Sequence, residues 1–113
     1  MEESVDTESF EFEFYSEMPG SDAGLRSEAE GRLRELATGH TDMIGASVAL
    51  DELSGSTTPH RYEARVVVYM RPEDVVAVEK GKAAEVALKG ALDAVERQVR
   101  QRRDKLRQPW KQP

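Results

Sequence analysis

Six basic residues stand close together near the C-terminal end of the sequence, at a density that can bind phosphate groups. They are Arg97, Arg100, Arg102, Arg103, Lys105 and Arg107. A guanidinium group offers a planar fork of donors that matches phosphate geometry, and an ammonium group adds a mobile positive charge. Such contacts favour a nucleic-acid backbone as the partner. An acidic protein surface, the acidic N-terminal segment of the chain itself, or simple exposure to water are the other interpretations.

These residues lie on a long helix that the sequence predicts from Lys82 to about Gln108. At 100° per residue, the apolar side chains between Ala84 and Leu106 gather on one face of this helix. The opposite face, which we expect to contact water, carries Lys89, Arg97, Arg100, Arg103 and Arg107. Arg102 falls on the apolar side, which indicates that the helix extends beyond its own core there.

The charge of the chain is distributed unevenly along the sequence. The formal net charge is −6. Residues 80–113 carry ten Lys and Arg against four Asp and Glu, whereas residues 1–79 carry six against eighteen. The field of the whole protein would repel phosphate, but over a Debye length of roughly 8–10 Å a ligand responds to the nearest face. The local excess of positive charge therefore keeps a nucleic-acid partner open.

Little in the sequence indicates an enzyme, a cofactor or a small-molecule substrate. The absence of cysteine excludes disulfides, thiol nucleophiles and Cys-based metal sites. His40 and His60 are isolated from each other, and there is no glycine-rich phosphate loop. No apolar run is long enough to cross a membrane, and the N-terminus is acidic rather than signal-like. We therefore expect a cytoplasmic binding protein without a metal ion.

The elements that must position the basic helix follow from hydrophobic periodicity. Period-2 and helical patterns predict a strand at Phe10–Tyr15, a helix from Asp22 to about Thr38, and strands at Met43–Leu53, Tyr62–Met70 and Val75–Glu79. The expected fold is α+β with the order β-α-β-β-β-α, in which two helices pack on one face of a four-stranded sheet. We expect residues 1–9 to form an acidic flexible tail, residues 10–108 a single domain, and residues 109–113 a C-terminal tail.

This order of elements resembles that of the ribosome hibernation-promoting factors, also called ribosome-associated inhibitor A or sigma-54 modulation proteins. The resemblance covers about residues 9–107 and rests on the strand YEARVVVYM and the helix AAEVALKGALDAVERQVRQRRDKL. Its most specific part is Ala94–Arg100, AVERQVR, which is similar to the family run K-L-E-R-Q-L-x-K. Ala94 departs from this run, where the family often has lysine. The chain ends without the second, dimerising domain of the long members, so it resembles the short form.

The resemblance implies binding to rRNA of the small ribosomal subunit, where the domain occludes the path of mRNA and tRNA and so inhibits translation. It also allows for a ribosome-dimerising partner factor. The rRNA-binding residues that it implies are Arg97 and Arg100 first, then Arg103 and Lys105 on the same helix, with Arg26 and Arg34 on the first helix and Arg65 on the third strand. Lys89, Arg102 and Arg107 complete the set of candidates.

Two other functions stay open at this point. The last three strands and the last helix have the outline of a double-stranded-RNA-binding domain, and Lys80 and Lys82 are similar to its phosphate-contacting lysines. A diverged regulatory domain that kept the fold could instead present the basic helix to an acidic protein.

Overall fold

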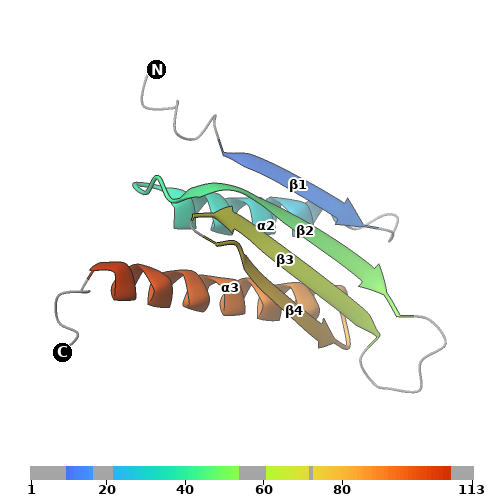
Figure 1. Cartoon of the computed structure of the whole chain (residues 1–113). Coiled ribbons are helices and arrows are strands. Elements are labelled where there is room, and N and C mark those ends of the chain that lie inside the picture. Colours follow the sequence, from blue (N-terminus) through green and yellow to red (C-terminus); the bar gives the residue numbers. More distant parts are fainter. Residues whose placement is uncertain (1–9, 17–21, 54–60, 72, 108–113) are drawn as a thin grey trace.

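The elements of the structure occur in the predicted order. The computed structural model describes residues 10–16, 22–53, 61–71 and 73–107. Its elements are β1 (Glu11–Ser16), α2 (Asp22–Ala37), β2 (Met43–Glu52), β3 (Tyr62–Met70), β4 (Val75–Gly81) and α3 (Ala84–Arg107), as Figure 1 shows. The two predicted tails, residues 1–9 and 109–113, lie outside the described residues.

The four strands form one mixed sheet in the order β1-β2-β3-β4. Strands β1 and β2 are parallel, because α2 carries the chain back across the sheet between them. Strands β2, β3 and β4 form an antiparallel meander. The register between β2 and β3 shifts between Met43 and Gly45, so Ile44 is an extra residue in a β-bulge.

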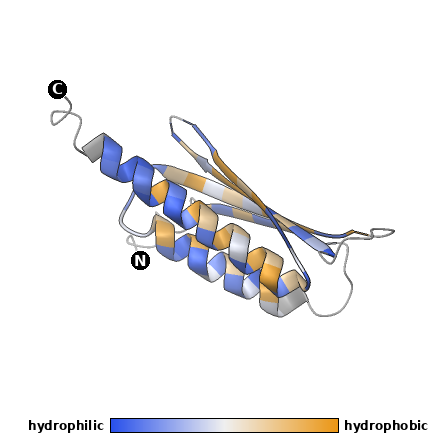
Figure 2. Ribbon diagram, turned by 90° about the horizontal axis from the view of Figure 1, so that it is seen from below, coloured by the Kyte–Doolittle hydropathy of each residue, from blue (hydrophilic) through white to orange (hydrophobic). Residues whose placement is uncertain are grey.

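Both helices pack on the same face of the sheet, and the other face is open (Figure 2). The core between the layers holds one row of side chains from each strand, among them Val48, Val66 and Ala77. Helix α2 contributes Leu33, and α3 contributes Leu92. The predicted α+β architecture, with two helices on one side of four strands, is therefore confirmed.

Strand β1 shows why the strand predictions succeeded. Phe10, directly before the strand, is buried, and Phe12 and Phe14 pack partly buried against the core. Glu11 and Glu13 alternate with them and are exposed. Successive side chains of a strand point to opposite faces, so three phenylalanines two residues apart must lie on one side.

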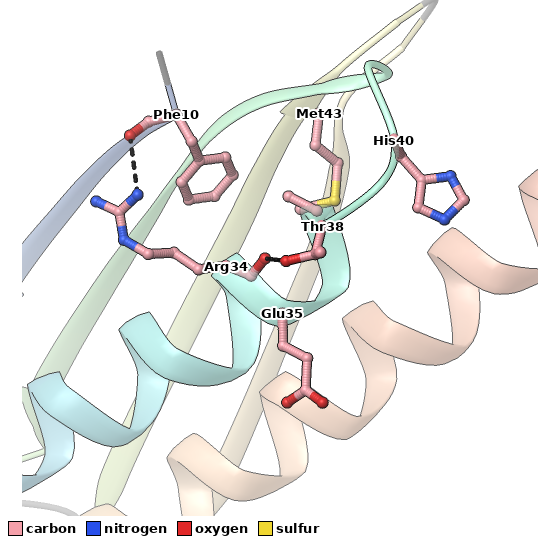
Figure 3. A pocket seen from close by; sticks show the side chains of 7 residues that line it. Phe10, Arg34, Glu35, Thr38, His40 and Met43 are labelled. Carbon is pink, nitrogen blue, oxygen red and sulfur yellow. Dashed lines mark hydrogen bonds between the residues drawn. The ribbon is translucent and has the colours of Figure 1, made fainter. Parts of the chain in front are cut away.

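A small pocket lies where α2 ends, between the start of β1 and the start of β2 (Figure 3). Helix α2 ends at Ala37. Gly39, in the turn that follows, has a positive φ of 80°, and the N–H of His40 donates to the carbonyl of Ala37 over 3.0 Å. Phe10 and Met43 lie across the pocket from α2. His40 is exposed, as expected of a surface residue after a helix C-terminus.

Candidate nucleic-acid interface

Helix α3 changes character along its length, as Figure 2 shows by its colours. Its first part buries Leu88, Leu92, Val95 and Val99 completely or almost completely against the sheet. After Val99 the helix presents mainly polar and charged side chains. The stretch that can meet an external ligand is therefore held rigidly by the buried stretch before it.

Four cations of α3 are exposed and have no ion pair or side-chain hydrogen bond with any residue that the structure describes. They are Lys89, Arg97, Arg100 and Lys105. We call Arg97, Arg100 and Lys105 the basic surface. An ideal α-helix places these three within an arc of roughly 140°, so one extended anion could contact all of them. No carboxylate of the described residues must be displaced before these groups bind phosphate, which makes them the best candidates in the site.

Arg103 does not face water as the helical wheel predicted. Its Nε and Nη2 donate to the two carboxylate oxygens of Asp42 over 2.7 and 2.8 Å, and its Nη1 donates to the carbonyl of Leu36 over 3.1 Å. Only 15% of the Arg103 side chain is exposed. Hydrogen bonds from Arg103 are the largest cause that lowers the pKa of Asp42, although partial burial acts in the opposite direction. Arg103 joins α3 to the C-terminal end of α2.

Arg102 also has a partner among the described residues. Its guanidinium donates to the carbonyl of Glu73 and lies 3.9 Å from the carboxylate of the same residue. At this position α3 contacts the turn between β3 and β4 rather than a strand of the sheet. Arg107 ends α3, and its side chain lies outside the described residues.

The two arginines of α2 have partners as well. Arg34 donates to Glu30 over 2.9 Å and to the carbonyl of Phe10 over 3.4 Å, and its guanidinium lies 5.3 Å from the centre of the Phe10 ring (Figure 3). Arg26 lies 3.8 Å from Glu30 and 5.7 Å from the centre of the Phe12 ring. Both tie α2 to β1 or to itself, so an external phosphate would compete with these contacts.

Arg65 is exposed, but it lies on the other side of the molecule. It alternates with Ala64 and Val66, which are buried under the helices, so its side chain projects from the open face of the sheet. The structure therefore does not bring Arg65 together with Arg97 and Arg100. A single flat ligand cannot contact both sides of the sheet at once.

Arg32 is a residue that the sequence analysis did not single out. It donates to Asp93 over 2.7 Å and to Glu96 over 3.0 Å, and so connects α2 with α3. These bonds, with Glu96 as the first cause, raise the pKa of Arg32. Asp93 and Glu96 lie on α3, where their negative charges reduce the net positive charge of the helix. Arg32 adds one positive charge beside these two carboxylates, so it offsets one of their two negative charges.

Arg100 lines a hollow between the two helices, together with residues of the Arg32 contact. The hollow is lined by Arg32, Glu35, Leu36, Glu96 and Arg100. On the other side of α3, Lys105 lines a second hollow with Gln98, Gln101, Arg102 and Val75 of β4. Arg97 lies on the ridge of α3 between Arg100 and Lys105, at the helical angle that separates them.

Within the described part of the chain, no group of three or more His, Asp or Glu side chains is arranged to hold a metal ion. No described helix combines the length and apolar character needed to span a membrane. What the described site offers is therefore electrostatic contact through fixed cations.

Solved structures of other proteins share this fold. The N-terminal domain of Protein Y from Thermus thermophilus superposes with a TM-score of 0.63 at 21% identity, covering 79% of this chain and 93% of that one. A ribosomal subunit interface protein from Coxiella burnetii gives a TM-score of 0.65 at 8% identity, covering 83% of this chain and 98% of that one. No curated protein sequence matches the chain significantly.

The sequence matches one family model over residues 20–107, which extends from just before α2 to the end of α3. The match includes the whole basic surface and the Arg103–Asp42 contact. The chain therefore belongs to the sigma 54 modulation protein / S30EA ribosomal protein family.

Proposed function

We propose that this protein binds the small ribosomal subunit through phosphates of its rRNA and, in that position, occludes the path of mRNA and tRNA. The family and the names of the two structural neighbours, Protein Y and a ribosomal subunit interface protein, support a ribosomal partner. The observation that carries the proposal is the basic surface, where Arg97, Arg100 and Lys105 are exposed and have no described partner.

The proposed mechanism is steric and electrostatic, with no bond made or broken. The phosphate backbone releases bound counterions when cations replace them, so affinity falls as salt rises. The rigid packing of Leu92, Val95 and Val99 fixes the orientation of the cations before binding. Preorganised side chains lose less entropy on binding than mobile ones. In this proposal the sheet and α2 occupy the space through which mRNA and tRNA would otherwise pass.

Co-sedimentation with purified small ribosomal subunits over a salt series tests the binding. Contacts from Lys89 and the three residues of the basic surface would give a slope of log affinity against log salt on the order of −3 to −4. Arg97→Glu combined with Arg100→Glu should abolish co-sedimentation and leave the thermal melt unchanged. Arg61→Glu is the control for charge reversal at an exposed arginine outside the basic surface, because Arg61 precedes β3 and its N–H donates to the carbonyl of Gly81, before α3 begins. No co-sedimentation at low salt would overturn the proposal.

Competition measures the occlusion itself. If the protein occupies the mRNA and tRNA path, then mRNA with its cognate tRNA should displace it from small subunits, and the protein should lower tRNA binding in a filter assay. Simultaneous saturation by the protein and by tRNA would contradict occlusion while leaving ribosome binding intact.

A double-stranded-RNA binder is the second candidate, because Lys80 and Lys82 are also exposed without a described partner. This function predicts that bare RNA duplex binds as tightly as ribosomal subunits, and that Lys80→Ala with Lys82→Ala weakens binding more than Arg97→Ala with Arg100→Ala. The opposite ranking supports the ribosomal proposal. Binding that persists after complete nuclease digestion of the target would indicate an acidic protein partner.

A further inference from the structure

Four carboxylates precede the first strand, in a segment that the family model does not cover. They are those of Glu2, Glu3, Asp6 and Glu8, and residues 1–9 contain no lysine or arginine. We call residues 1–9 the acidic segment. It lies outside the described residues, and the family match begins only at residue 20. Because carboxylates offer charged acceptor oxygens to arginine much as phosphates do, this segment is a candidate ligand for exposed arginines.

The structure fixes the point at which the acidic segment joins the fold. Phe10, the first described residue, is buried and lines the pocket at the C-terminal end of α2. The side chain of Arg34 donates to the Phe10 carbonyl over 3.4 Å, and its guanidinium lies 5.3 Å from the centre of the ring. The acidic segment is therefore tethered beside the last turn of α2.

One helix separates this tether from the basic surface. Glu35 of α2 lines the Phe10 pocket and also lines the hollow that contains Arg100. In Figure 3 its side chain points from α2 toward α3, whereas Phe10 lies on the opposite side of α2. An α-helix with its side chains is about 10–12 Å wide. A chain that starts at Phe10 has to cross roughly this width to reach Arg100.

The carboxylates of the acidic segment differ in whether they can cross α2. An extended chain spans at most about 3.3–3.6 Å per residue. Glu8 is two positions from Phe10, so its backbone reaches about 7 Å, which is less than the width of the helix. Asp6 reaches about 13–14 Å, and Glu3 and Glu2 reach about 23–29 Å. Three of the four carboxylates can therefore reach the basic surface.

The basic surface has cations that are open to such a ligand. Its three members are exposed and have no partner among the described residues. Arg102 and Arg103 are not equally available, because Glu73 and Asp42 hold them. The three members of the basic surface are therefore the cations of this stretch that a carboxylate can contact without displacing a described partner.

Acidic side chains near the basic surface reduce its charge without cancelling it. Asp104 is the one acid among residues 97–107, and it is exposed. Glu35 is exposed on the facing helix. Asp93 and Glu96 accept hydrogen bonds from Arg32, which offsets one of their two charges. Positive charges still outnumber negative ones on this side of α3, so the acidic segment would meet a complementary surface.

Arg71 is a competing target at the same end of the sheet. It is exposed and has no side-chain partner among the described residues, and its N–H donates to the carbonyl of Asp42. Two strand spacings, roughly 10 Å, separate β1 from β3, so the acidic segment could reach it as well. Arg71 is a single cation close in sequence to the exposed acids Glu73 and Asp74, whereas α3 offers three cations together. Charge therefore favours the basic surface.

We propose that the acidic segment crosses the end of α2 and lies on the basic surface in the free protein, so that RNA has to displace it. The intramolecular contact depends on this chain alone, whereas its displacement by rRNA rests on the proposed function. Exposed ion pairs are weak one by one and are screened by salt. The tether compensates for this weakness, because it holds the carboxylates at a high effective concentration beside the arginines.

The consequence for binding is a lower apparent affinity. RNA binds only the molecules whose basic surface is uncovered, so the apparent Kd rises in inverse proportion to the uncovered fraction. An acidic segment that is in place in about 70–90% of molecules weakens binding about three- to tenfold. High salt releases the segment and removes this difference.

A paramagnetic label detects the contact in the free protein, without a ribosome. The chain contains no cysteine, so Val5→Cys takes a nitroxide at one known position, beside Asp6. We expect the label to broaden the NMR signals of the amides of residues 97–105, and high salt to abolish the broadening. The reference is the same labelled protein with its four carboxylates neutralised, by Glu2→Gln, Glu3→Gln, Asp6→Asn and Glu8→Gln. The tether is then unchanged and only the charge is lost, so equal broadening in both proteins overturns the inference.

Substitutions of the cations identify the surface that the segment contacts. Arg97→Gln with Arg100→Gln should reduce the broadening over residues 97–105. Arg61→Gln with Arg65→Gln is the matched control, since both are exposed arginines outside the basic surface, and it should leave the broadening unchanged. Broadening that is centred on Arg71 and lost in Arg71→Gln overturns the inference. Broadening that rises with protein concentration, as contact with a second copy requires, also overturns it.

Affinity for purified small ribosomal subunits measures the competition. The variant with four neutralised carboxylates should bind about three- to tenfold more tightly than the parent at low salt, and the two affinities should converge as salt rises. The matched control neutralises the same residue types at exposed positions toward the other end of the sheet, with Asp51→Asn, Glu52→Gln, Glu79→Gln and Glu85→Gln. It makes the same change in net charge and should alter affinity much less.

The two experiments distinguish failure of the inference from failure of the proposed function. If the label reports the contact on residues 97–105 but no variant binds small subunits, the intramolecular contact stands and the proposed function fails. If the parent protein binds and both four-residue variants tighten equally, or neither does, the inference is overturned and the proposed function stands.

Discussion

Arg103 of α3 holds the carboxylate of Asp42 through two parallel hydrogen bonds of 2.7 and 2.8 Å. Its third nitrogen donates to the carbonyl of Leu36, near the C-terminal end of α2. One side chain thereby fixes the end of α3, the end of α2 and the segment that leads into β2. Asp42 also accepts a backbone hydrogen bond at its carbonyl from Arg71, after β3, over 3.2 Å. The contact is thus a junction of four segments beside the basic surface.

Removing this junction should destabilise the fold rather than weaken binding directly. Arg103→Ala should lower the free energy of unfolding by about 1–3 kcal/mol, because Asp42 and the Leu36 carbonyl lose charged donors while partly buried. Urea unfolding of Arg103→Ala, Asp42→Ala and the double variant measures the coupling between the two residues. Arg103→Lys is the control and should recover only part of the loss, since lysine cannot make both bonds. Additive effects of the single variants would contradict the direct contact.

The Asp42 carboxylate should also give the fold a dependence on pH. Because its pKa is lower in the folded protein than in the unfolded chain, the unfolded chain binds the proton more readily in acid. The stabilisation is therefore complete at neutral pH and is lost as pH falls from about 4 toward the lowered folded pKa. Urea melts of the parent and of Asp42→Asn should differ most at pH 7, and the difference should shrink as the pH falls below about 4. A difference that stays constant over this range would contradict the prediction.

The order of elements and the core could be predicted because they depend on local period. Alternation places Phe10 and Val66 inward, and the 3.6-residue repeat places Leu92 and Val95 on one face, whatever their partners are. The exposure of Arg97 and Arg100 follows from the same repeat. These features could be predicted without knowing how the helix packs against the rest of the protein.

The roles of Arg102, Arg103 and Arg32 could not be predicted in this way. A helical wheel gives the direction of a side chain from its own axis, but not what another segment places there. Asp42 lies 61 residues before Arg103, and Glu73 lies 29 before Arg102, so only the packed structure brings them together. Arg32 likewise meets Asp93 and Glu96 across the helix pair.

Gly31 offers a route to a more stable protein. It lies in the interior of α2, and a methyl group built on it would meet nothing within 4 Å. Gly31→Ala should raise the free energy of unfolding by about 0.5–1 kcal/mol, because alanine restricts the unfolded chain and favours the helix. Thermal and urea melts measure the gain. Ribosome binding should be unchanged, and a lower melting temperature would show that α2 packs more tightly at this position than its open surroundings indicate.

Gly45 should respond in the opposite direction. A methyl group on Gly45 would lie 2.7 Å from the carbonyl oxygen of Glu11, which belongs to the backbone of the neighbouring strand. Gly45→Ala must therefore push β1 away from β2, and we expect a loss of about 1–3 kcal/mol in the free energy of unfolding. Amide hydrogen exchange should show the loss of protection first in β1 and β2. Equal protection in both proteins would mean that the sheet adjusts without opening.

Single substitutions on α3 should separate cations that bind phosphate from cations that hold the fold. Arg97→Ala, Arg100→Ala and Lys105→Ala should each reduce the slope of log affinity against log salt by about 0.7–0.9 and leave the melt unchanged. Each removes one exposed charge that has no partner among the described residues. Arg103→Ala should instead lower the melting temperature and leave the slope unchanged, since its guanidinium is already neutralised by Asp42. A reduced slope for Arg103→Ala would mean that the junction opens on the ribosome, so that Arg103 exchanges a carboxylate for a phosphate. Measuring the salt slope and the melting temperature of all four variants shows which cations of α3 bind phosphate and which stabilise the fold.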